Sequence, residues 1–326
     1  MRYMGVKEMN KGIEIVSLTK IEGANLNSDG TEGVIVVLKK VRDPVDMKEY
    51  VRVSGQSVKY HLKEILREKE GVEKLSKLSK ITGERGAAGK VIVSEGNPVK
   101  FMDDDLFGYM RTDKKKRRTA PVRTNGMISI FPYQEDRDFG VRYDSPEVEG
   151  YNPKSPEHNI HETEIATNIM RGNFFVETDR VGVFTDEEIE EAMALSDEER
   201  EERLKSLLDA IFEYYGGARL TRFFTKTYPE AMVIVFLNRK IPVIGDNFRI
   251  KQEYKEGKYI MDVSLLKEIL TMFDEYINKA WIGVIENKFA NIEEIKELEE
   301  SSEKIKVFSM KELKEAVKKE KILEAA

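Results

Sequence analysis

Strand-like segments spread along most of the chain limit the folds that it can adopt. Two of them, Gly33–Lys39 and Ala231–Leu237, are almost continuous runs of Val, Ile and Leu, which is typical of buried strands. Gly12–Lys20 and residues 174–184 alternate between apolar and polar side chains, which also predicts strands. The polar, turn-rich residues 22–30 are expected to lie outside any strand. A sheet must therefore bring together distant parts of the chain.

A helix is expected after Ser54-Gly55. Its predicted apolar side is a single stripe formed by Val58, Leu62, Ile65 and Leu66. A second side carries basic residues spaced four apart: Lys59, Lys63 and Arg67. This helix can therefore pack on the sheet through one side and present positive charge on another.

A second helix is predicted to begin at Ser196, because Ser196-Asp-Glu-Glu199 is a capping box. Its expected apolar face consists of Leu204, Leu207, Leu208, Ile211, Phe212 and Tyr215. Gly216-Gly217 should end it. Two more amphipathic helices are expected near Asp262–Asn278 and Ser309–Leu323. The order of strands and helices predicts a mixed α+β core.

Composition excludes several classes of protein. A chain of 326 residues, 40% of them hydrophobic, can form about two domains or one domain with large insertions. The absence of cysteine excludes disulfides, thiol catalysis and cysteine-ligated zinc. No run approaches the roughly 18 apolar residues of a membrane span, so we expect a cytoplasmic protein. Charged residues make up 35% and Gln occurs three times, which suggests a thermophilic source.

Charge is unevenly distributed along the chain. The formal net charge is −6, but residues 186–202 hold ten acidic residues and one basic residue. Residues 111–123 hold seven basic residues and one acidic residue. Proteins that bind phosphate often separate their acidic and basic residues in this way. The acidic segment can equally be a solvated helix face, and the basic segment a solvated loop.

Three motifs resemble catalytic or ligand-binding sites, each with an ordinary alternative. His158 and His161, beside Glu162, could ligate a metal on a helix, but the prolines before them favour a loop. Asp103-Asp-Asp105 could bind Mg²⁺, although three consecutive acids more often cap a helix or form salt bridges. Residues 83–90 resemble a phosphate-binding P-loop only in their glycines, and could instead form a tight turn or hold one backbone phosphate. We expect no metal, no cofactor and no catalytic residue.

A diffuse signal for nucleic-acid binding occurs three times. Basic residues with interleaved polar groups lie at 52–63, 111–123 and 219–226. The last segment reads Arg219-Leu-Thr-Arg-Phe-Phe and places basic side chains beside aromatic ones, as phosphate contact and base stacking require. Each segment alone is weak, and only their repetition favours an RNA-binding protein.

Several segments together resemble one known family. They are Asn25–Asp29, Tyr50–His61, Asp105–Gly108, Arg118–Arg123, Ile160–Glu164 and Arg171–Phe175. In order and spacing, over about residues 10 to 240, the chain is similar to the DevR-type backbone subunit of type I CRISPR interference complexes (Cascade), in the RAMP superfamily. The combination is far more specific than any one segment.

The resemblance implies a ferredoxin-like, RRM-related palm with a fingers insertion and a projecting thumb hairpin. On this chain the palm would comprise residues 1–70 and 167–245, the fingers 71–137 and the thumb 138–166. Residues 246–326 would form a C-terminal helical extension. Family members polymerise head to tail along the spacer of a CRISPR RNA, and base pairing of that guide with target DNA supplies the specificity.

The resemblance and the basic segments give one set of expected RNA contacts: Asn25, Asn27, Arg52, Gln56, Lys59, Lys63, Arg118, Arg123, His158, His161, Arg171, Arg219 and Arg222. Expected partners are CRISPR RNA, target DNA, further copies of the chain, the handle-binding and large subunits, and a recruited helicase-nuclease; a membrane is not expected. Relatives in RNA-targeting complexes cut RNA with an aspartate in the loop that holds Asp29 here. The alternatives are therefore a metal-dependent ribonuclease that uses Asp29, and a regulator of its own operon that binds duplex DNA.

Overall fold

The computed structural model describes residues 10–82, 90–155 and 157–324. The glycine-rich segment 83–89 thus lies outside the described residues. An eight-stranded sheet runs through the centre in the order β20-β19-β16-β1-β13-β10-β5-β4. Its strands are β1 (Gly12–Ala24), β4 (Lys40–Arg42), β5 (Glu49–Ser54), β10 (Val122–Ser129), β13 (Ala166–Val176), β16 (Ala231–Leu237), β19 (Ile277–Val284) and β20 (Ile305–Ser309). Neighbouring strands are antiparallel except β19 and β20.

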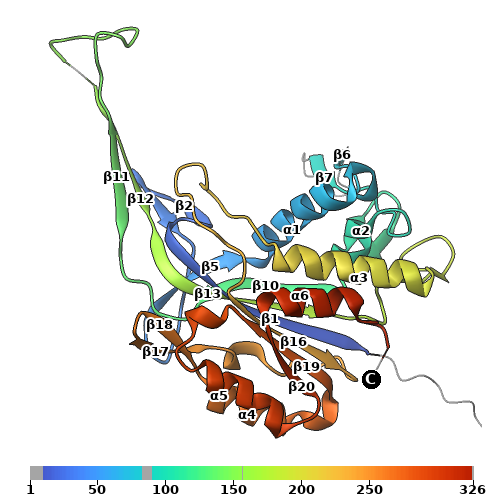
Figure 1. Cartoon of the computed structure of the whole chain (residues 1–326). Coiled ribbons are helices and arrows are strands. Elements are labelled where there is room, and N and C mark those ends of the chain that lie inside the picture. The colour runs from blue at the N-terminus through green and yellow to red at the C-terminus, as the bar shows by residue number, and fades with distance from the viewer. Residues whose placement is uncertain (1–9, 83–89, 156, 325–326) are drawn as a thin grey trace, which may run out of the picture.

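Helices cover both faces of this sheet (Figure 1). Side chains alternate along β1, so that Ile13 and Ile15 belong to one apolar cluster and Val16 and Leu18 to the other. The first cluster lies under α1 (Gly55–Glu70), α3 (Asp197–Phe212) and α6 (Met310–Lys319). The second lies under α4 (Val263–Met272) and α5 (Ile292–Lys296). The predicted mixed core of helices and strands is confirmed.

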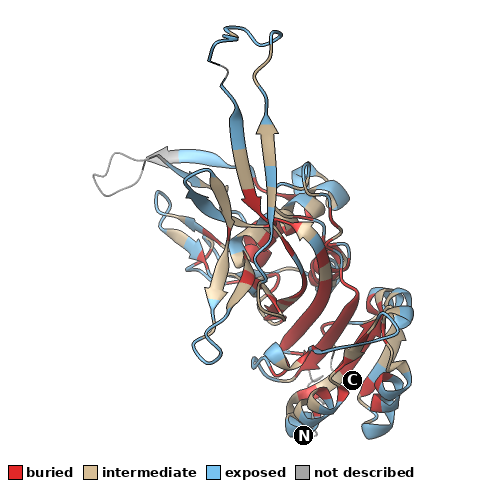
Figure 2. Ribbon diagram, turned by 90° about the vertical axis from the view of Figure 1, so that its left-hand side faces the viewer, coloured by how far each residue is buried: buried red, intermediate tan, exposed pale blue. Residues whose placement is uncertain are grey.

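A long hairpin projects from the body, with most of its residues partly or fully exposed (Figure 2). It consists of β11 (Arg137–Arg142) and β12 (Asn159–Glu164), in a side sheet with β2 (Ser28–Glu32) and β3 (Ile35–Leu38). The strand predicted at Gly33–Lys39 is present as β3, but it is not buried as predicted, since β3 supports the hairpin and Val34 is 60% exposed. The prediction that residues 22–30 lie outside any strand is also wrong, because β1 and β2 both extend into them.

The segment between α1 and β10, residues 71–121, is called the insertion below. It contains η1 (Val72–Lys74), β6 (Ser79–Thr82), β7 (Lys90–Val93), α2 (Met102–Phe107), β8 (Tyr109–Arg111) and β9 (Lys116–Arg118). The range predicted for the fingers, 71–137, extends too far, because β10 belongs to the main sheet. The small ribbon β14 (Val183–Phe184) and β15 (Met193–Ala194) lies between β13 and α3.

The capping boxes at Ser196 and Ser309 begin α3 and α6 as predicted. Two details of the helix predictions are wrong. Tyr215 lies beyond the end of α3 and is exposed, while its neighbour Tyr214 is buried. The helix predicted at Asp262–Asn278 ends at Met272, and β19 begins at Ile277. Likewise, the strand predicted at 174–184 ends at Val176.

The expectation of a helical extension over residues 246–326 also needs correction. Besides three helices this segment forms the hairpin β17 (Ile250–Lys255) and β18 (Lys258–Met261), and it adds β19 and β20 to the main sheet. Short 3₁₀ helices connect these elements: η2 (Gly245–Asn247), η3 (Asp274–Tyr276), η4 (Glu286–Lys288) and η5 (Glu297–Ser301). The C-terminal segment is thus part of the central core. Within the described residues, no helix is long and apolar enough to cross a membrane.

Candidate nucleic-acid interface

Three segments meet between the projecting hairpin and the insertion, and we call the surface that they form the saddle. They are the loop 25–27 between β1 and β2, the cap Ser54 with the first turns of α1 (55–63), and the loop 216–227 after α3 (Figure 1). The side-chain oxygen of Asn27 accepts a hydrogen bond of 2.8 Å from the Ser54 amide. The Ala218 amide donates to the Leu26 carbonyl oxygen at 2.7 Å. These bonds fix the first loop to both other segments.

Two glycines make this close packing possible. A Cβ atom on Gly216 would lie 2.2 Å from the His61 ring, and one on Gly217 would lie 2.5 Å from the Leu26 side chain. Any larger residue would push the loop away from α1 and from the loop after β1. Burial under the same loop lowers the pKa of His61. α3 ends at Phe212, before the glycines that were predicted to stop it, and these glycines instead join the parts of the saddle.

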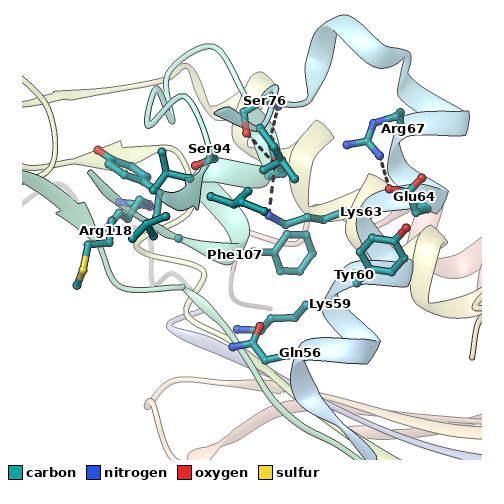
Figure 3. Close-up of a pocket in the computed structure, with 18 of the residues that line it drawn as sticks. Gln56, Lys59, Tyr60, Lys63, Glu64, Arg67, Ser76, Ser94, Phe107 and Arg118 are labelled. Carbon is teal, nitrogen blue, oxygen red and sulfur yellow. Dashed lines mark hydrogen bonds and ion pairs between the residues drawn. The ribbon is translucent and has the colours of Figure 1, made fainter. Parts of the chain in front are cut away.

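The outer side of α1 forms one wall of a cleft of about 1140 Å³. Gln56, Lys59, Tyr60 and Lys63 point from α1 toward the insertion (Figure 3). The opposite wall includes apolar side chains of the insertion: Leu78, Val91, Ile92, Phe107 and Met110. A cleft with cations on one side and apolar groups on the other can hold a ligand that is both anionic and partly aromatic.

Lys59 is a half-buried cation without an opposite charge beside it. Lys63 lies 3.4 Å from the Asp103 carboxylate and Arg67 pairs with Glu64, whereas the Lys59 side chain has no ion pair or hydrogen bond within the described ranges. Burial lowers the pKa of Lys59, and the charge of Lys63 lowers it further. An anion bound here would relieve both effects.

The loop 216–227 adds two more cations to the saddle. Arg219 is exposed, and its backbone has a φ of +56°, where non-glycine residues are uncommon. Arg222 forms an ion pair with Asp138 at the base of the hairpin. The structure thus places Gln56, Lys59 and Lys63 on the side of α1 that faces the insertion, while the loop with Arg219 and Arg222 packs on the same helix at His61.

Two of the residues expected to contact RNA are structural instead. Asn25 is 0% exposed; its amide donates to the Glu164 carbonyl oxygen and its oxygen accepts from Ser28. Arg118 is 3% exposed and pairs with Asp105 and with Glu188, each at about 2.6–2.7 Å. Both predictions are corrected, because neither side chain can reach a ligand without breaking these bonds. Asn27 is half-buried and serves mainly to hold Ser54.

Three predicted contacts lie on a different surface, the sheet face opposite α1. Arg52 on β5 and Arg171 on β13 each pair with Ile128 on the strand between them, β10. The side chains of both arginines therefore lie on the same face of the sheet. The Nε atoms of both arginines are buried and have no hydrogen-bond partner. Arg123 lies on the same face of β10, exposed and paired with Glu177. These arginines could hold phosphate, but the saddle does not include them.

The histidines of the hairpin do not form a metal site. His158 precedes β12 at the exposed end and accepts a hydrogen bond from the Asp144 amide at 3.3 Å. His161 lies within β12 over Gly140, and residues three apart on an extended chain face opposite ways. No cluster of three metal-ligating side chains occurs within the described ranges. Asp29 is exposed on β2 and pairs with Lys39 at 2.7 Å.

The comparisons with known proteins agree with this geometry. The model of the family described as "CRISPR-associated negative auto-regulator DevR/Csa2" matches residues 18–259, about three quarters of the chain. The chain belongs to the DevR/Csa2 family. No curated protein matches this DevR/Csa2 sequence significantly.

Solved structures resemble this DevR/Csa2 chain in fold. One belongs to a "CRISPR RNA-guided surveillance complex, pre-nicking", with a TM-score of 0.61 and 12% identity; the match covers 94% of this chain and 100% of the other. A second, from a "CRISPR RNA-guided surveillance complex", has a TM-score of 0.55 and 13% identity over 87% of this chain and 92% of the other. At this identity the likeness establishes the fold alone.

The set of RNA contacts expected from the sequence leaves out two aromatic residues of the DevR/Csa2 saddle. Tyr60 lines the cleft beside Lys59, and Phe224 stands exposed at the end of the basic loop. For Phe224 a signal was present, because the Arg-Phe-Phe sequence pairs a cation with aromatic rings. The sequence held no such signal for Tyr60, since an aromatic residue on an amphipathic helix usually belongs to the core.

Proposed function

We propose that this chain is a backbone subunit of a Cascade complex, which binds CRISPR RNA through the saddle and polymerises head to tail along the guide. The observation that carries the proposal is Lys59, a half-buried cation without a partner in the described structure, on the helix against which the loop with Arg219 and Arg222 packs. RNA supplies closely spaced phosphates, which neutralise such cations without any reading of sequence.

The strand order supports the proposed ferredoxin-like, RRM-related palm. The elements β1, α1, β10, β13, α3 and β16 follow one another as strand–helix–strand–strand–helix–strand. The four strands lie in the order β16-β1-β13-β10, with the first and third strands in the centre. The insertion would then act as fingers and the β11–β12 hairpin as the thumb.

A scaffold of this kind needs no chemistry of its own. In the proposed assembly the protein holds the backbone of the guide, and pairing with target DNA provides the specificity. Contacts between unlike surfaces of successive copies would extend an open helical array. The handle-binding subunit, the large subunit and a recruited helicase-nuclease are proposed as further partners, in the cytoplasm.

Two other functions make different predictions. A ribonuclease that uses Asp29 would need metal ligands around it, whereas Asp29 has Lys39 beside it. Asp103 and Asp105, the other candidate acids, are buried and held by Ser76, Arg118 and Arg203. The description of the family as a negative auto-regulator raises the second function, binding to the promoter of its own operon. A specific footprint on that promoter would support it.

The salt dependence of RNA binding tests the proposed saddle. We would measure the affinity for a fluorescein-labelled, single-stranded RNA across a salt series, for the wild type and for the double variant Lys59→Gln/Arg219→Gln. Neither side chain has an ion pair or hydrogen bond in the described structure, so the fold should be unaffected. Removing the cation that neutralises one phosphate reduces the slope of log affinity against log salt by about 0.7 for single strands, so a change of roughly 1.4 is expected.

The matched control is Lys267→Gln/Lys318→Gln, which removes two exposed lysines of α4 and α6, away from the saddle. Its slope should equal that of the wild type. An unchanged slope in the saddle variant, or an equal change in both variants, would remove the saddle from the RNA-binding surface.

A further inference from the structure

Phe224 is the most exposed aromatic side chain in the described part of the chain. It lies in the loop 216–227 with 80% of its surface open to solvent. One exposed apolar side chain is ordinary by itself, but an aromatic ring on a basic loop is the combination that binds the bases of single-stranded nucleic acids. No residue of the described ranges covers this ring, which leaves it open to a partner.

The loop holds Phe224 in place firmly. Its two ends are joined, because the Gly216 amide donates to the Thr227 hydroxyl at 3.0 Å. Next to the ring, the buried Thr225 hydroxyl accepts a hydrogen bond of 3.1 Å from the Glu22 amide. Compact loops whose ends meet in this way are frequently functional. A fixed aromatic ring loses little conformational entropy when it binds a flat partner.

The charges around Phe224 indicate what that partner is. Arg222 lies over the neighbouring Phe223 ring at 5.0 Å, and Arg219 is on the same loop. The loop stands between the hairpin and α1, on the saddle (Figure 1). An exposed ring beside cations matches a nucleotide, whose base stacks on the ring while its phosphate meets the cations.

We propose that Phe224 is a stacking platform for one unpaired nucleobase of the bound RNA. The inference rests on the proposed function and goes beyond it, because it assigns a contact to a base where the saddle cations contact only phosphates. Stacking tolerates any of the four bases, since every base has a flat aromatic face. The platform therefore adds affinity without limiting the sequence of the guide.

The test separates base contact from phosphate contact. We would compare the wild type, Phe224→Ala and Phe224→Trp for binding to a mixed-sequence, single-stranded RNA and to an abasic ribose-phosphate strand of equal length. On the RNA, Phe224→Ala should bind about 5- to 100-fold more weakly, as removal of the stacking surface for one base predicts, with an unchanged salt slope. Phe224→Trp should retain wild-type affinity. On the abasic strand all three proteins should bind equally.

Tyr254→Ala serves as the matched control, because Tyr254 is 59% exposed on β17, outside the saddle. Its affinity for RNA should not change. Equal binding of RNA by Phe224→Ala and the wild type would overturn the stacking platform, while the slope test with Lys59 and Arg219 would still stand. An equal loss on the abasic strand would also overturn it. A third result would also overturn the platform: Phe224→Ala changes the sedimentation of the RNA-free protein and has no base-dependent effect on binding. That result would place the ring against a second copy of the chain.

Discussion

Replacement of Asp105 by alanine should destabilise the protein strongly, because this carboxylate connects the insertion to α3. Asp105 is 0% exposed and accepts hydrogen bonds from Arg118 and Arg203, both at 2.6 Å, and from the Gly182 amide at 2.9 Å. Burial raises the pKa of Asp105, and the two guanidinium groups oppose that effect. The carboxylate is thus a buried anion held by two cations from different elements.

The size of the effect follows from what Asp105→Ala leaves behind. Two buried guanidinium groups lose a shared partner, and breaking a buried ion pair in this way costs about 3–5 kcal/mol. Arg118 keeps Glu188, and Arg203 keeps the Pro98 and Val99 carbonyl oxygens, so the lower half of that range is expected. With an unfolding entropy of roughly 2.1 cal/mol/K per residue, a loss of about 3–4 kcal/mol lowers the Tm of a chain this long by about 4–6 °C.

Thermal unfolding measured by circular dichroism checks this value, and hydrogen exchange locates the effect. Exchange should rise in the insertion while β1, β13 and β16 stay protected. Asp113→Ala is the control, since Asp113 forms an exposed ion pair with Arg111 in the same insertion and should cost less than about 1 kcal/mol. Equal shifts of Tm for the two variants would refute the reasoning about the buried carboxylate.

Three further outcomes are expected. Ser196→Ala removes the capping box of α3 and should cost about 1 kcal/mol in urea unfolding; no loss would mean that the cap is redundant. Hydrogen bonds from Lys314 and Lys69 lower the pKa of Glu213, so its stabilisation is present at neutral pH and disappears as pH falls through that lowered pKa. Glu213→Gln should therefore be less stable than the wild type at pH 7, by up to about 1 kcal/mol, and equally stable below about pH 3; a difference that persists in acid would contradict this. Because the pKa of Lys59 is lowered, the affinity of the wild type for a single-stranded oligonucleotide should fall more steeply than that of Lys59→Arg as the pH rises toward the ordinary lysine pKa of about 10.4, and parallel curves would remove Lys59 from the contact.

Local signals in the sequence predicted the helices that carry the saddle. Ser54 and Ser196 are helix caps, and each cap acts within three residues of itself. β19 gave no equally clear signal, because the short apolar run after Asn278 fits a strand or a buried helix equally well. The exposure of β3 could not be inferred either, since it depends on pairing with β12, more than a hundred residues away.

The same limit explains the errors at the candidate site. Arg118 stands in a basic run that resembles a phosphate-binding surface, but its partners Asp105 and Glu188 come from other parts of the chain. The sequence shows the charge of Arg118 and gives no sign of its burial. Lys59 and Lys63 were predicted to share an exposed side because helical spacing is local. The packing of the loop 216–227 against the same helix, through Gly216 and Gly217, is a long-range contact that no local pattern shows.

Purification of the tagged protein from a host that carries a CRISPR array, followed by sequencing of the nucleic acid that accompanies it, tests the central claim most directly. If the chain is a guide-binding backbone subunit, it will carry RNA of fairly uniform length with repeat-derived ends, as an assembly of several copies. A clean, RNA-free monomer would contradict the claim. RNA that shortens when Mg²⁺ is added would contradict it as well, and would make Asp29 the first residue to replace.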